Sequence, residues 1–575
     1  MCAIIGVVGE NLPPQKVIEK ARDVMTHRGP DDAGIYYREN EGIALGHRRL
    51  SIIDLSKDGQ QPFFSYDKRY TIIFNGEIYN YLELKEELKD KYPFQTKTDT
   101  EVLLAAYMTW GRECLTKLRG MFSFTIWDAR EKMLFGARDR FGIKPFYYAS
   151  QDNVFYFASE IKGLLALGIR AQPNEKTIFH YLYYGYYDHS KDTFFESIQS
   201  LRPGHFFTHK EGNFLMEKYW DIKDESGTYV YIKTKEDIYE MFKTLLSDSI
   251  RLHFRSDVPV GVNLSSGVDS NALLYYAEKV TGSDASALSM CLESEEYDEC
   301  RTIKSSLSEK HLKRWHTVNI NVPTFLFAGK EMITVQDEPY GGIPTILYES
   351  LMRLAKEKGV TVLLEGQGVD ELLAGYAYYR EGEGGIGLSQ DRTQEMYADL
   401  LHQDFIKKYK KEPATFEEPF DDKLLNMQYR DIYYTKLPRV LRFNDHTSMA
   451  YGRELRVPYL DHKFASFMFH LPKEFKIDKN QQKILIREVM KELVPEVIKN
   501  KPKKAFGAIQ TEWFRNFYKD DIVSILESSS FKARPFWDHK KLKQKVEEFF
   551  GGRGENSFFI WQCVNLELWF RKFID

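Results

Sequence analysis

Cys2 follows the initiator methionine directly and stands in an apolar run that ends at Glu10. Residues 4–8 are β-branched or small, which predicts a buried β-strand at the start of the chain. If Met1 is removed, Cys2 carries both a thiol and a free α-amine. Such an amine has a pKa of about 7.7–8.0, so it can take the thiol proton near pH 7. Cys2 is therefore a candidate N-terminal nucleophile, with a small apolar residue in a strand as the alternative.

The chain has 575 residues, too many for one ordinary core, and this length predicts two to four domains. Its net charge of −4 gives no argument for nucleic-acid binding, and it has no apolar run long enough to span a membrane. The five cysteines are scattered and none forms a CxxC pair, so we expect neither a disulfide framework nor a zinc site. These features predict a globular protein of the reducing cytoplasm.

Short strands interleaved with helices predict a layered, sheet-rich domain over residues 1–220. Expected strands cover residues 70–74, 122–127, 133–137, 145–149 and 154–158, and expected helices cover residues 80–88 and 100–110. The polar stretch 221–228 predicts a linker, which we place at 221–235.

Residues 236–575 show a different pattern, in which strand, small-residue loop and helix follow one another. This order predicts a parallel α/β sheet. Expected elements are a helix at 236–253, a strand at 258–264, a turn at 265–270, a helix at 271–280, strands at 286–291 and 360–364, and a helix at 346–358. From about residue 395 the sequence is mostly helical and aromatic.

The turn at 265–270 reads Ser-Ser-Gly-Val-Asp-Ser and has the composition of an anion-binding loop. Small residues let backbone N–H groups approach a phosphate, and the N-terminus of the following helix adds unsatisfied donors. Asp269 would repel phosphate, so it suits a magnesium ion. A serine-rich turn that only caps a helix is the alternative.

Two further clusters fit the same chemistry. Residues 364–371 follow an apolar strand, and Asp370 there offers a second carboxylate for magnesium, with Glu371 in support. Lys483 and Arg487 are four residues apart on an expected helix and would share a face. A solvated basic helix face is the alternative for this pair.

Cys2 and the 265–270 loop, in this order, resemble glutamine-hydrolysing asparagine synthetase over nearly the whole chain. The resemblance also rests on residues 27–31, 47–54, 74–80, 98–101 and 138–145 in the first half and on residues 448–450, 454–461 and 501–506 in the second. It implies an αββα sandwich of the N-terminal-nucleophile glutaminase type, followed by an ATP-pyrophosphatase domain with a parallel sheet and helical additions.

The resemblance also implies roles for individual residues. The glutaminase site would consist of Cys2 as nucleophile, the Asn75 side chain and the Gly76 N–H as oxyanion donors, Arg49 for the glutamine α-carboxylate, and Glu77 and Asp99 for its α-ammonium, with the backbone of Leu50 and Ile52 assisting. ATP and its pyrophosphate would contact Leu264, Ser265, Ser266, Gly267, Asp269, Ser270, Gly366, Gln367 and Lys483, and Mg²⁺ would bind Asp269 and Asp370. Lys483 would stabilise the departing pyrophosphate, after an acceptor carboxylate has attacked ATP to form an acyl-adenylate. Ammonia would reach it through a protein channel.

Several residues depart from the family pattern. Ala3 replaces a usual glycine, which predicts slower glutamine hydrolysis. Gln367 stands where studied members carry a glutamate thought to act as general base, and an amide cannot take a proton. Glu365 or Glu371 could replace it, or ammonia could arrive already neutral. Ala505 and His446 also depart, with no effect that we can assign.

The acceptor therefore stays open. Aspartate is the leading acceptor, and a uronic-acid sugar of surface polysaccharide synthesis is the runner-up, because Gln367 and residues 336–345 resemble that branch. A β-lactam-synthetase-like cyclase and a degenerate glutamine- or ATP-binding protein are more distant alternatives. The expected partners are small molecules, with no nucleic acid and no membrane, and a homodimer is one candidate assembly.

Overall fold

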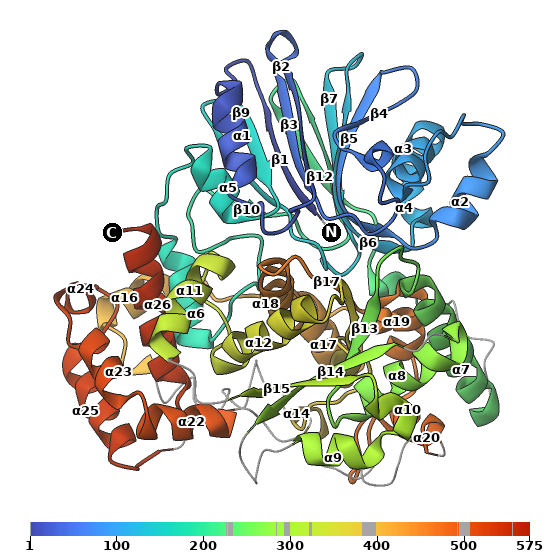
Figure 1. Ribbon diagram of the computed structural model, residues 1–575. Helices are drawn as coiled ribbons and strands as arrows, with labels where there is room; N and C mark the ends of the chain where they lie inside the picture. Colours follow the sequence, from blue (N-terminus) through green and yellow to red (C-terminus); the bar gives the residue numbers. More distant parts are fainter. Residues whose placement is uncertain are drawn as a thin grey trace.

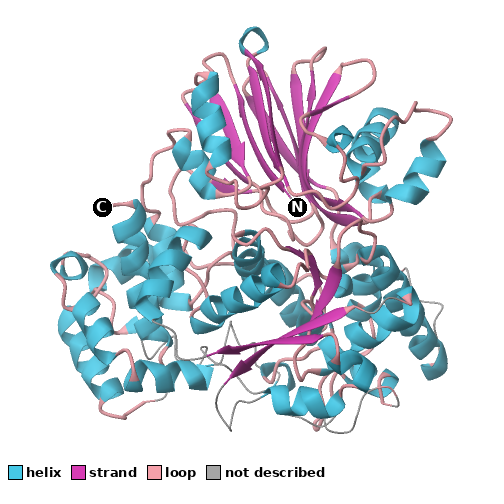
Figure 2. Cartoon of the chain, viewed as in Figure 1, coloured by secondary structure: helices cyan, strands magenta, loops and turns pink. Residues whose placement is uncertain are grey.

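The computed structural model describes residues 2–225, 227, 234–282, 285–292, 299–320, 325–381, 398–491, 493, 507–554 and 556–575. Two stacked antiparallel sheets lie above a parallel sheet, and a group of C-terminal helices lies beside the parallel sheet (Figures 1 and 2). The predicted two-part α/β architecture is confirmed. No helix of the described residues is long and apolar enough to cross a membrane.

The first sheet has six strands in the order β10-β8-β9-β1-β3-β2, and the second has six in the order β12-β11-β7-β6-β5-β4. The first is built from β1 Cys2–Val8, β2 Asp32–Arg38, β3 Ile43–Arg49, β8 Tyr147–Gln151, β9 Val154–Ala158 and β10 Gln199–Ser200. The second is built from β4 Phe63–Phe64, β5 Tyr70–Ile78, β6 Gly120–Asp128, β7 Met133–Arg138, β11 His205–Lys210 and β12 Asn213–Lys218. The helices are α1 Gln15–Asp23, α2 Tyr81–Leu88, α3 Asp99–Trp110, α4 Cys114–Lys117, α5 Ile161–Ala166 and α6 Glu175–Tyr184.

The alternation along β1 shows why all seven of its residues are buried. Ala3, Ile5 and Val7 pack in the same core as residues of α1 and α5, whereas Ile4 and Val8 pack between the two sheets. On the far side, α2 and α3 cover the second sheet. A strand buried on both faces reads as a continuous apolar run, which is the pattern that predicted β1. The four layers form the expected αββα sandwich.

The parallel sheet has five strands in the order β15-β14-β13-β16-β17, and every neighbouring pair is parallel. They are β13 Val260–Asn263, β14 Ser286–Leu292, β15 Trp315–Ile320, β16 Val362–Leu364 and β17 Glu454–Arg456. The helices of this half are α7 Lys235–His253, α8 Val268–Thr281, α9 Glu299–Ser306, α10 Glu309–Leu312, α11 Phe325–Gln336, α12 Ile343–Glu357, α13 Val369–Leu372, α14 Tyr378–Glu381, α16 Gln403–Tyr409, α17 Lys423–Arg430, α18 Leu437–Met449, α19 His462–Phe469, α20 Ile484–Val489, α22 Gly507–Asn516, α23 Lys519–Leu526, α24 Ser529–Lys532, α25 His539–Phe550 and α26 Phe558–Phe573. Helices α7, α8 and α19 share one core with the sheet, and α12 shares another.

Several expected boundaries differ from the structure by two to four residues, and two of them have a clear physical reason. The helix expected at 271–280 begins at Val268, because Gly267 takes the N-cap position and Asp269 and Ser270 are acceptable in a first turn. The strand expected at 145–149 begins at Tyr147, after Pro145, which lacks the N–H that a sheet ladder needs. The motif at 501–506 lies outside the described residues.

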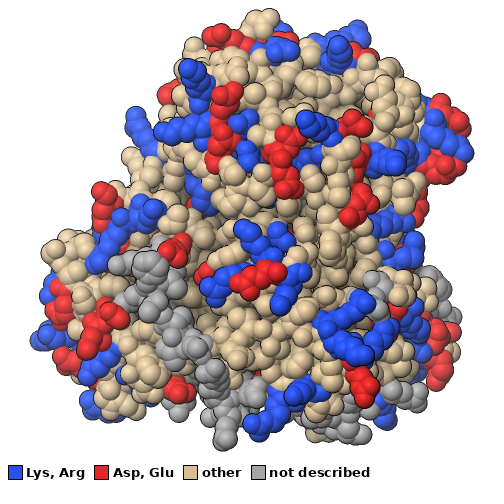
Figure 3. All heavy atoms as spheres, in the orientation of Figure 1, with Lys and Arg blue, Asp and Glu red and all other residues tan. Residues whose placement is uncertain are grey.

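On the face shown in Figure 3, acidic and basic side chains are interspersed rather than gathered by sign. This distribution agrees with the small net charge of −4. The N-terminus of β1 lies at the boundary between the sandwich and the parallel half (Figure 1). Cys2, the first residue of β1, therefore lies at this boundary.

Candidate active sites

Strands β1, β3 and β5 bring most of the predicted glutaminase residues into one pocket. Cys2 pairs with Arg49 across β1 and β3, and Asn75 to Glu77 lie near the end of β5. The pocket is lined by Cys2, Arg49, Leu50, Ile52, Ile53, Gly59, Gln61, Phe74, Gly76, Glu77, Thr98, Asp99 and Thr100. Residues far apart in sequence, from Cys2 to Thr100, thus line one pocket.

Asn75 is oriented by the backbone of Cys2. The Cys2 nitrogen donates to Asn75 Oδ1 at 3.0 Å. Asn75 is fully buried, and its Nδ2 has no hydrogen-bond partner among the described residues. A buried, unpaired donor costs free energy unless a ligand satisfies it. The amide is therefore a preoriented donor beside the nucleophile, as an oxyanion site requires.

Two buried carboxyl groups lie in the pocket without enough countercharge. Burial raises the pKa of Asp99 to about 6, although the Ile78 N–H donates to Asp99 Oδ2 at 2.9 Å. Burial, with Glu454 and Asp99 nearby, raises the pKa of Glu77 well above its ordinary value. A bound ammonium group would supply the missing positive charge. Burial also raises the pKa of the Cys2 thiol, so the nucleophile needs a base.

Arg49 is fixed by the loop that follows β3. Its Nη1 donates to the Ser56 carbonyl at 2.7 Å, and its Nη2 donates to the carbonyl of Asp54. A Cβ on Gly59 would lie 2.1 Å from Arg49 Nη2, so only glycine leaves room for this guanidinium. The Arg49 fork is thus held at the pocket wall by loop geometry.

The expectation that Ala3 hinders the pocket has no structural counterpart. Its side chain packs in the core shared with α1 and α5, on the face of β1 opposite Ile4. Ala3 does not line the pocket. Its methyl group therefore takes no space from a bound substrate.

The serine-rich loop forms a compact turn between β13 and α8. Ser265 N and Oγ each lie 3.1 Å from Ser270 Oγ, and the Gly267 N–H donates to Ser265 Oγ at 3.2 Å. Asn271 Nδ2 donates to the carbonyls of Ser265 and Gly267. Leu264 precedes the turn and its N–H donates to the Leu288 carbonyl at 2.8 Å. The turn stands at the carboxyl end of a parallel strand and at a helix N-terminus, where anions bind in α/β sheets.

Lys483 joins the two predicted magnesium ligands. Its Nζ lies 2.6 Å from Asp269 Oδ2 and 2.8 Å from Asp370 Oδ1. Lys483 is not on a helix, contrary to expectation: it is the N-cap of α20 in a left-handed conformation, so it does not share a helix face with Arg487. A Cβ on Gly375 would lie 2.1 Å from Asp370 Oδ1, which shows how tightly the backbone packs here.

The carboxylates of Asp269 and Asp370 converge on the Lys483 ammonium, and two such carboxylates could also hold a magnesium ion. Asp269 Oδ1 is buried and has no hydrogen-bond partner among the described residues. Carboxylate oxygens are the ligands that Mg²⁺ prefers. Gly366 packs against Asp269, where a Cβ would lie 3.2 Å from the Asp269 Cβ. The residues present therefore fit the ion, and Asp269 and Asp370 would hold it.

Gln367 and Glu371 occupy different surroundings. Gln367 lines a cavity at the boundary between the two halves, together with Glu365 and Lys144. Glu371 is buried and accepts from Tyr376 OH at 2.7 Å, and burial beside Asp370 raises the pKa of Glu371 to about 7. Gln367, unlike Glu371, therefore lines a cavity whose wall includes residues of the sandwich.

Strand β17 was not predicted, because three residues give no periodic signal. It is an edge of the parallel sheet, and it carries Arg456 to the glutaminase pocket. Arg456 Nη2 lies 3.5 Å from Glu77 Oε2, and Arg456 Nε lies 2.6 Å from Glu454 Oε1. Nearby, Arg28 of the sandwich donates to the Cys2 carbonyl and pairs with Asp445 of α18 at 2.8 Å. The two halves thus meet through buried charges beside the nucleophile.

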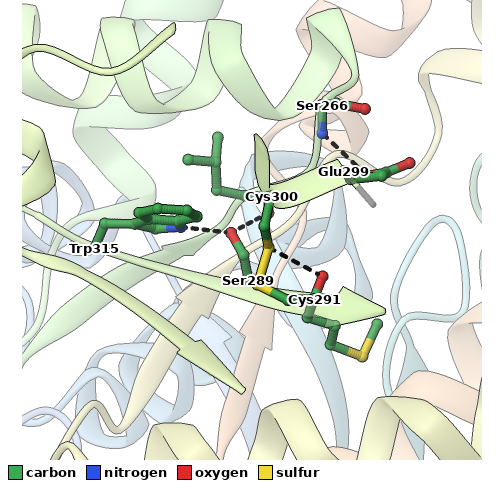
Figure 4. Close-up of a disulfide and its surroundings, with 8 residues drawn as sticks. Ser266, Ser289, Cys291, Glu299, Cys300 and Trp315 are labelled. Carbon is green, nitrogen blue, oxygen red and sulfur yellow. Dashed lines mark hydrogen bonds between the residues drawn. A yellow bond between two sulfur atoms is a disulfide. The ribbon is translucent and has the colours of Figure 1, made fainter. Parts of the chain in front are cut away.

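A disulfide joins Cys291 at the end of β14 to Cys300 in α9, with a Cα–Cα distance of 5.4 Å (Figure 4). The expectation of no disulfide was wrong here, because pairing depends on Cα distance and not on CxxC spacing. The neighbouring residue Glu299 accepts from the Ser266 N–H at 3.2 Å. The link therefore lies against the serine-rich turn.

Known proteins resemble both halves of the chain. A family model described as a glutamine amidotransferase domain matches residues 1–220, and one described as asparagine synthase matches residues 241–571. Asparagine synthetase [glutamine-hydrolyzing] 1 of Bacillus subtilis is 30% identical and covers 99% of this chain and 97% of its own. A putative asparagine synthetase of Methanocaldococcus jannaschii is 35% identical over 66% of this chain and 77% of its own.

Two other matches differ in name or extent. A protein of Gibberella zeae named amidase chry2 is 27% identical over 93% of this chain and 91% of its own. A solved glutamine phosphoribosylpyrophosphate amidotransferase from B. subtilis is 16% identical, covers 63% of this chain and 80% of its own, and has a TM-score of 0.30.

Proposed function

The chain belongs to the asparagine synthase family as a glutamine-dependent amidotransferase, and from this premise we propose that it converts a carboxylate into its amide through an acyl-adenylate. The observation that carries the proposal is the contact of Arg456 on β17 with Glu77 in the glutaminase pocket. The two candidate sites then face a shared, buried boundary. We assign residues 1–220 to glutamine hydrolysis, 221–235 to a linker and 236–575 to synthesis.

In the glutaminase half, Cys2 Sγ attacks the side-chain carbonyl carbon of glutamine. The free α-amine that removal of Met1 leaves takes the thiol proton, since the described residues lining the pocket include no histidine. Asn75 Nδ2 and the Gly76 N–H stabilise the oxyanion, each donor being worth roughly 3–4 kcal/mol of barrier. Arg49 holds the α-carboxylate, and Glu77 and Asp99 hold the α-ammonium. The adduct collapses to a thioester as its C–N bond breaks, and the nitrogen takes the proton from the α-amine and leaves as ammonia. Water then hydrolyses the thioester, and glutamate leaves.

Ammonia released at Cys2 has a short route to the synthetase half. The pocket ends at Glu77, which contacts β17, and the N–H of Glu365 donates to the Arg456 carbonyl on that strand. Glu365 and Gln367 line the boundary cavity with Ile143 and Lys144 of the sandwich. We propose that ammonia passes along β17 into this cavity, shielded from bulk water.

In the synthetase half, the turn at Ser265–Ser270 holds the pyrophosphate of ATP. Asp269 and Asp370 would hold Mg²⁺, which would supply positive charge to neutralise the phosphates. Lys483 contributes positive charge beside the leaving pyrophosphate. Gly366 has no side chain, so residues 364–371 can approach the turn at residues 265–270. The acceptor carboxylate attacks the α-phosphorus, pyrophosphate leaves, and ammonia then displaces AMP from the acyl carbon.

Aspartate is the leading acceptor, because the full-length relatives carry the name asparagine synthetase. Two relatives of similar coverage are named amidases, which favours keeping other carboxylates in view. A uronic-acid sugar is the second candidate. Residues 336–345 differ from the usual acceptor region of the family. Two of them make contacts with the sandwich: Asp337 pairs with Lys162, and Glu338 accepts a hydrogen bond from the Phe194 N–H.

The test is an acceptor screen on purified protein that reads pyrophosphate release with ATP, Mg²⁺ and glutamine. Aspartate is compared with uronic acids, and a no-acceptor reaction is the control. Acceptor-dependent pyrophosphate with an equal amount of AMP supports the proposal. ATP binding by calorimetry without turnover for any acceptor would instead support a binding protein. Intact mass measured on the same sample shows whether Met1 is removed.

A further inference from the structure

Glu365 is a buried carboxyl group that the reaction described so far does not use. It follows β16, it is 1% exposed, and it lines the boundary cavity beside Gln367. Its two oxygens are each held by an amide: Asn263 Nδ2 donates to Oε1 at 2.8 Å and Asn444 Nδ2 donates to Oε2 at 3.1 Å. These two asparagines come from β13 and α18, so the carboxyl group is held from two directions.

The charge environment separates Glu365 from Asp445 and Glu160, two other buried carboxylates of the boundary. Asp445 pairs with Arg28 and Lys144, and Glu160 pairs with Arg28 and Lys162. Glu365 has no lysine or arginine partner among the described residues. The charged groups of the cavity, Lys144 and Asp445, lie 3.3 Å apart and neutralise each other.

A buried glutamate that served packing alone would be expected to have a cationic partner. Burial raises the pKa of Glu365 to about 7, against the opposing hydrogen bonds of Asn263 and Asn444. A carboxyl group poised near the working pH is suited to accept and release a proton. Gln367 in the same cavity carries only an amide, which cannot accept one.

We propose that Glu365 is the general base of amide formation, a role that rests on the proposed function. As ammonia attacks the acyl carbon, the nitrogen lone pair forms the C–N bond and the nitrogen becomes positively charged. Glu365 takes one proton from that nitrogen. The tetrahedral adduct then collapses, the bond from carbon to the phosphate oxygen breaks, and AMP leaves with the electron pair. The amide oxygen of Gln367 accepts a hydrogen bond from the same nitrogen and orients it.

The kinetic test compares wild type, E365Q and the double variant E365Q/Q367E, with ammonium chloride as the nitrogen source. E365Q should lower the rate of amide formation by about 10²–10⁴-fold and, when the rate is compared at a constant concentration of free NH3, remove its rise with pH around 7. Glutamate release from glutamine and acceptor-dependent ATP–pyrophosphate exchange should stay within about twofold of wild type. The double variant should recover at least part of the lost rate, because it returns a carboxylate to the cavity.

A matched control is E349Q, which removes a carboxylate that Tyr451 OH contacts and that does not line the cavity. It should leave amide formation and its pH profile unchanged. Amide formation by E365Q at the wild-type rate with an unchanged pH profile would overturn the proposal. An equal loss of ATP–pyrophosphate exchange and amide formation would also overturn it, since it would indicate a structural role.

An infrared titration separates this proposal from the proposed function. The wild-type minus E365Q difference spectrum isolates one carboxyl group and needs no substrate. A protonated-carboxyl band that disappears with a midpoint near pH 7 supports a pKa of about 7 for Glu365. A Glu365 carboxyl group that is already ionised at pH 5 contradicts it. If wild type shows that band but no acceptor-dependent pyrophosphate release with any acceptor, the proposed function fails and the base assignment fails with it.

Discussion

Arg456 Nη2 lies 3.5 Å from Oε2 of Glu77, and this contact joins the edge of the parallel sheet to the floor of the glutaminase pocket. Arg456 is fully buried and also donates to the carbonyls of His253 and Arg255. A guanidinium that is anchored on one half and paired with a carboxylate of the other fixes their relative position. We therefore expect that mutation can abolish either reaction separately, although the two sites lie beside one another.

Replacing Cys2 by alanine should abolish glutamine use and spare synthesis from ammonium salts. The thiol is the nucleophile, so glutamate release should fall at least roughly 1,000-fold. The measurement is glutamate release beside amide formation from ammonium chloride. Cys114→Ala is the control, because Cys114 is a free, buried cysteine of the same half that does not line the pocket. Normal glutamine hydrolysis by Cys2→Ala would remove the nucleophile assignment.

Gly59→Ala should raise KM for glutamine about tenfold or more. An added Cβ would lie 2.1 Å from Arg49 Nη2 and would push the guanidinium away from the α-carboxylate. Steady-state glutaminase kinetics give the change, and ammonium-dependent synthesis should not move. Gly227→Ala serves as control, since its Cβ would meet nothing within 4 Å. An unchanged KM would show that Arg49 does not bind the substrate.

Removing Mg²⁺ with EDTA should stop pyrophosphate release while glutamine hydrolysis continues. Asp269→Asn should raise the Mg²⁺ concentration needed for half-maximal pyrophosphate release, because one of the two carboxylate ligands is lost. The readout is a Mg²⁺ titration of pyrophosphate release. Full activity in EDTA, or an unchanged titration in Asp269→Asn, would refute the metal assignment.

Asp445→Asn should weaken the boundary between the halves. Burial alone would raise the pKa of Asp445, but Arg28 and Lys144 outweigh it and hold this pKa below its ordinary value. Removing one partner of such a buried network costs about 3–5 kcal/mol. The expected result is an earlier denaturant midpoint at pH 7 and a lower yield of amide per glutamine consumed.

The sign of the pH dependence follows from the lowered pKa. The ion pair contributes stability above the unfolded-state pKa of about 3.9 and loses it as pH falls through the lower folded-state value. The difference between wild type and Asp445→Asn should therefore be full at pH 6 and shrink below about pH 4. A difference in midpoint that is the same at pH 3 and pH 6 would exclude this ion pair as its source.

The sandwich and the parallel sheet could be predicted from sequence because their strands carry long apolar runs and their turns carry glycine, asparagine and serine. β1 was predicted from its run of buried residues, and the turn before α8 from its small residues. Boundaries were less certain where one residue changes the outcome, as at Gly267, which caps α8 earlier than expected.

The boundary between the halves could not be predicted. β17 is three residues long, and Arg456 and Glu77 are far apart in sequence, so no local pattern joins them. The same holds for Cys291 and Cys300, whose pairing depends on the distance between β14 and α9. Lys483 was predicted to lie on a helix, but it is the N-cap of α20, and its left-handed backbone carries no signal in the sequence. Long-range packing determines each of these features.

The most direct test of the two-site account follows the nitrogen atom. The enzyme is supplied with ATP, Mg²⁺, the acceptor found in the screen, glutamine labelled with ¹⁵N in its side-chain amide, and a large excess of unlabelled ammonium chloride. Mass spectrometry of the amide product then reports the source of its nitrogen. The account predicts ¹⁵N in most of the product, because ammonia passes from Cys2 to Glu365 without mixing with solvent. A product whose label matches the diluted pool in solution would contradict it.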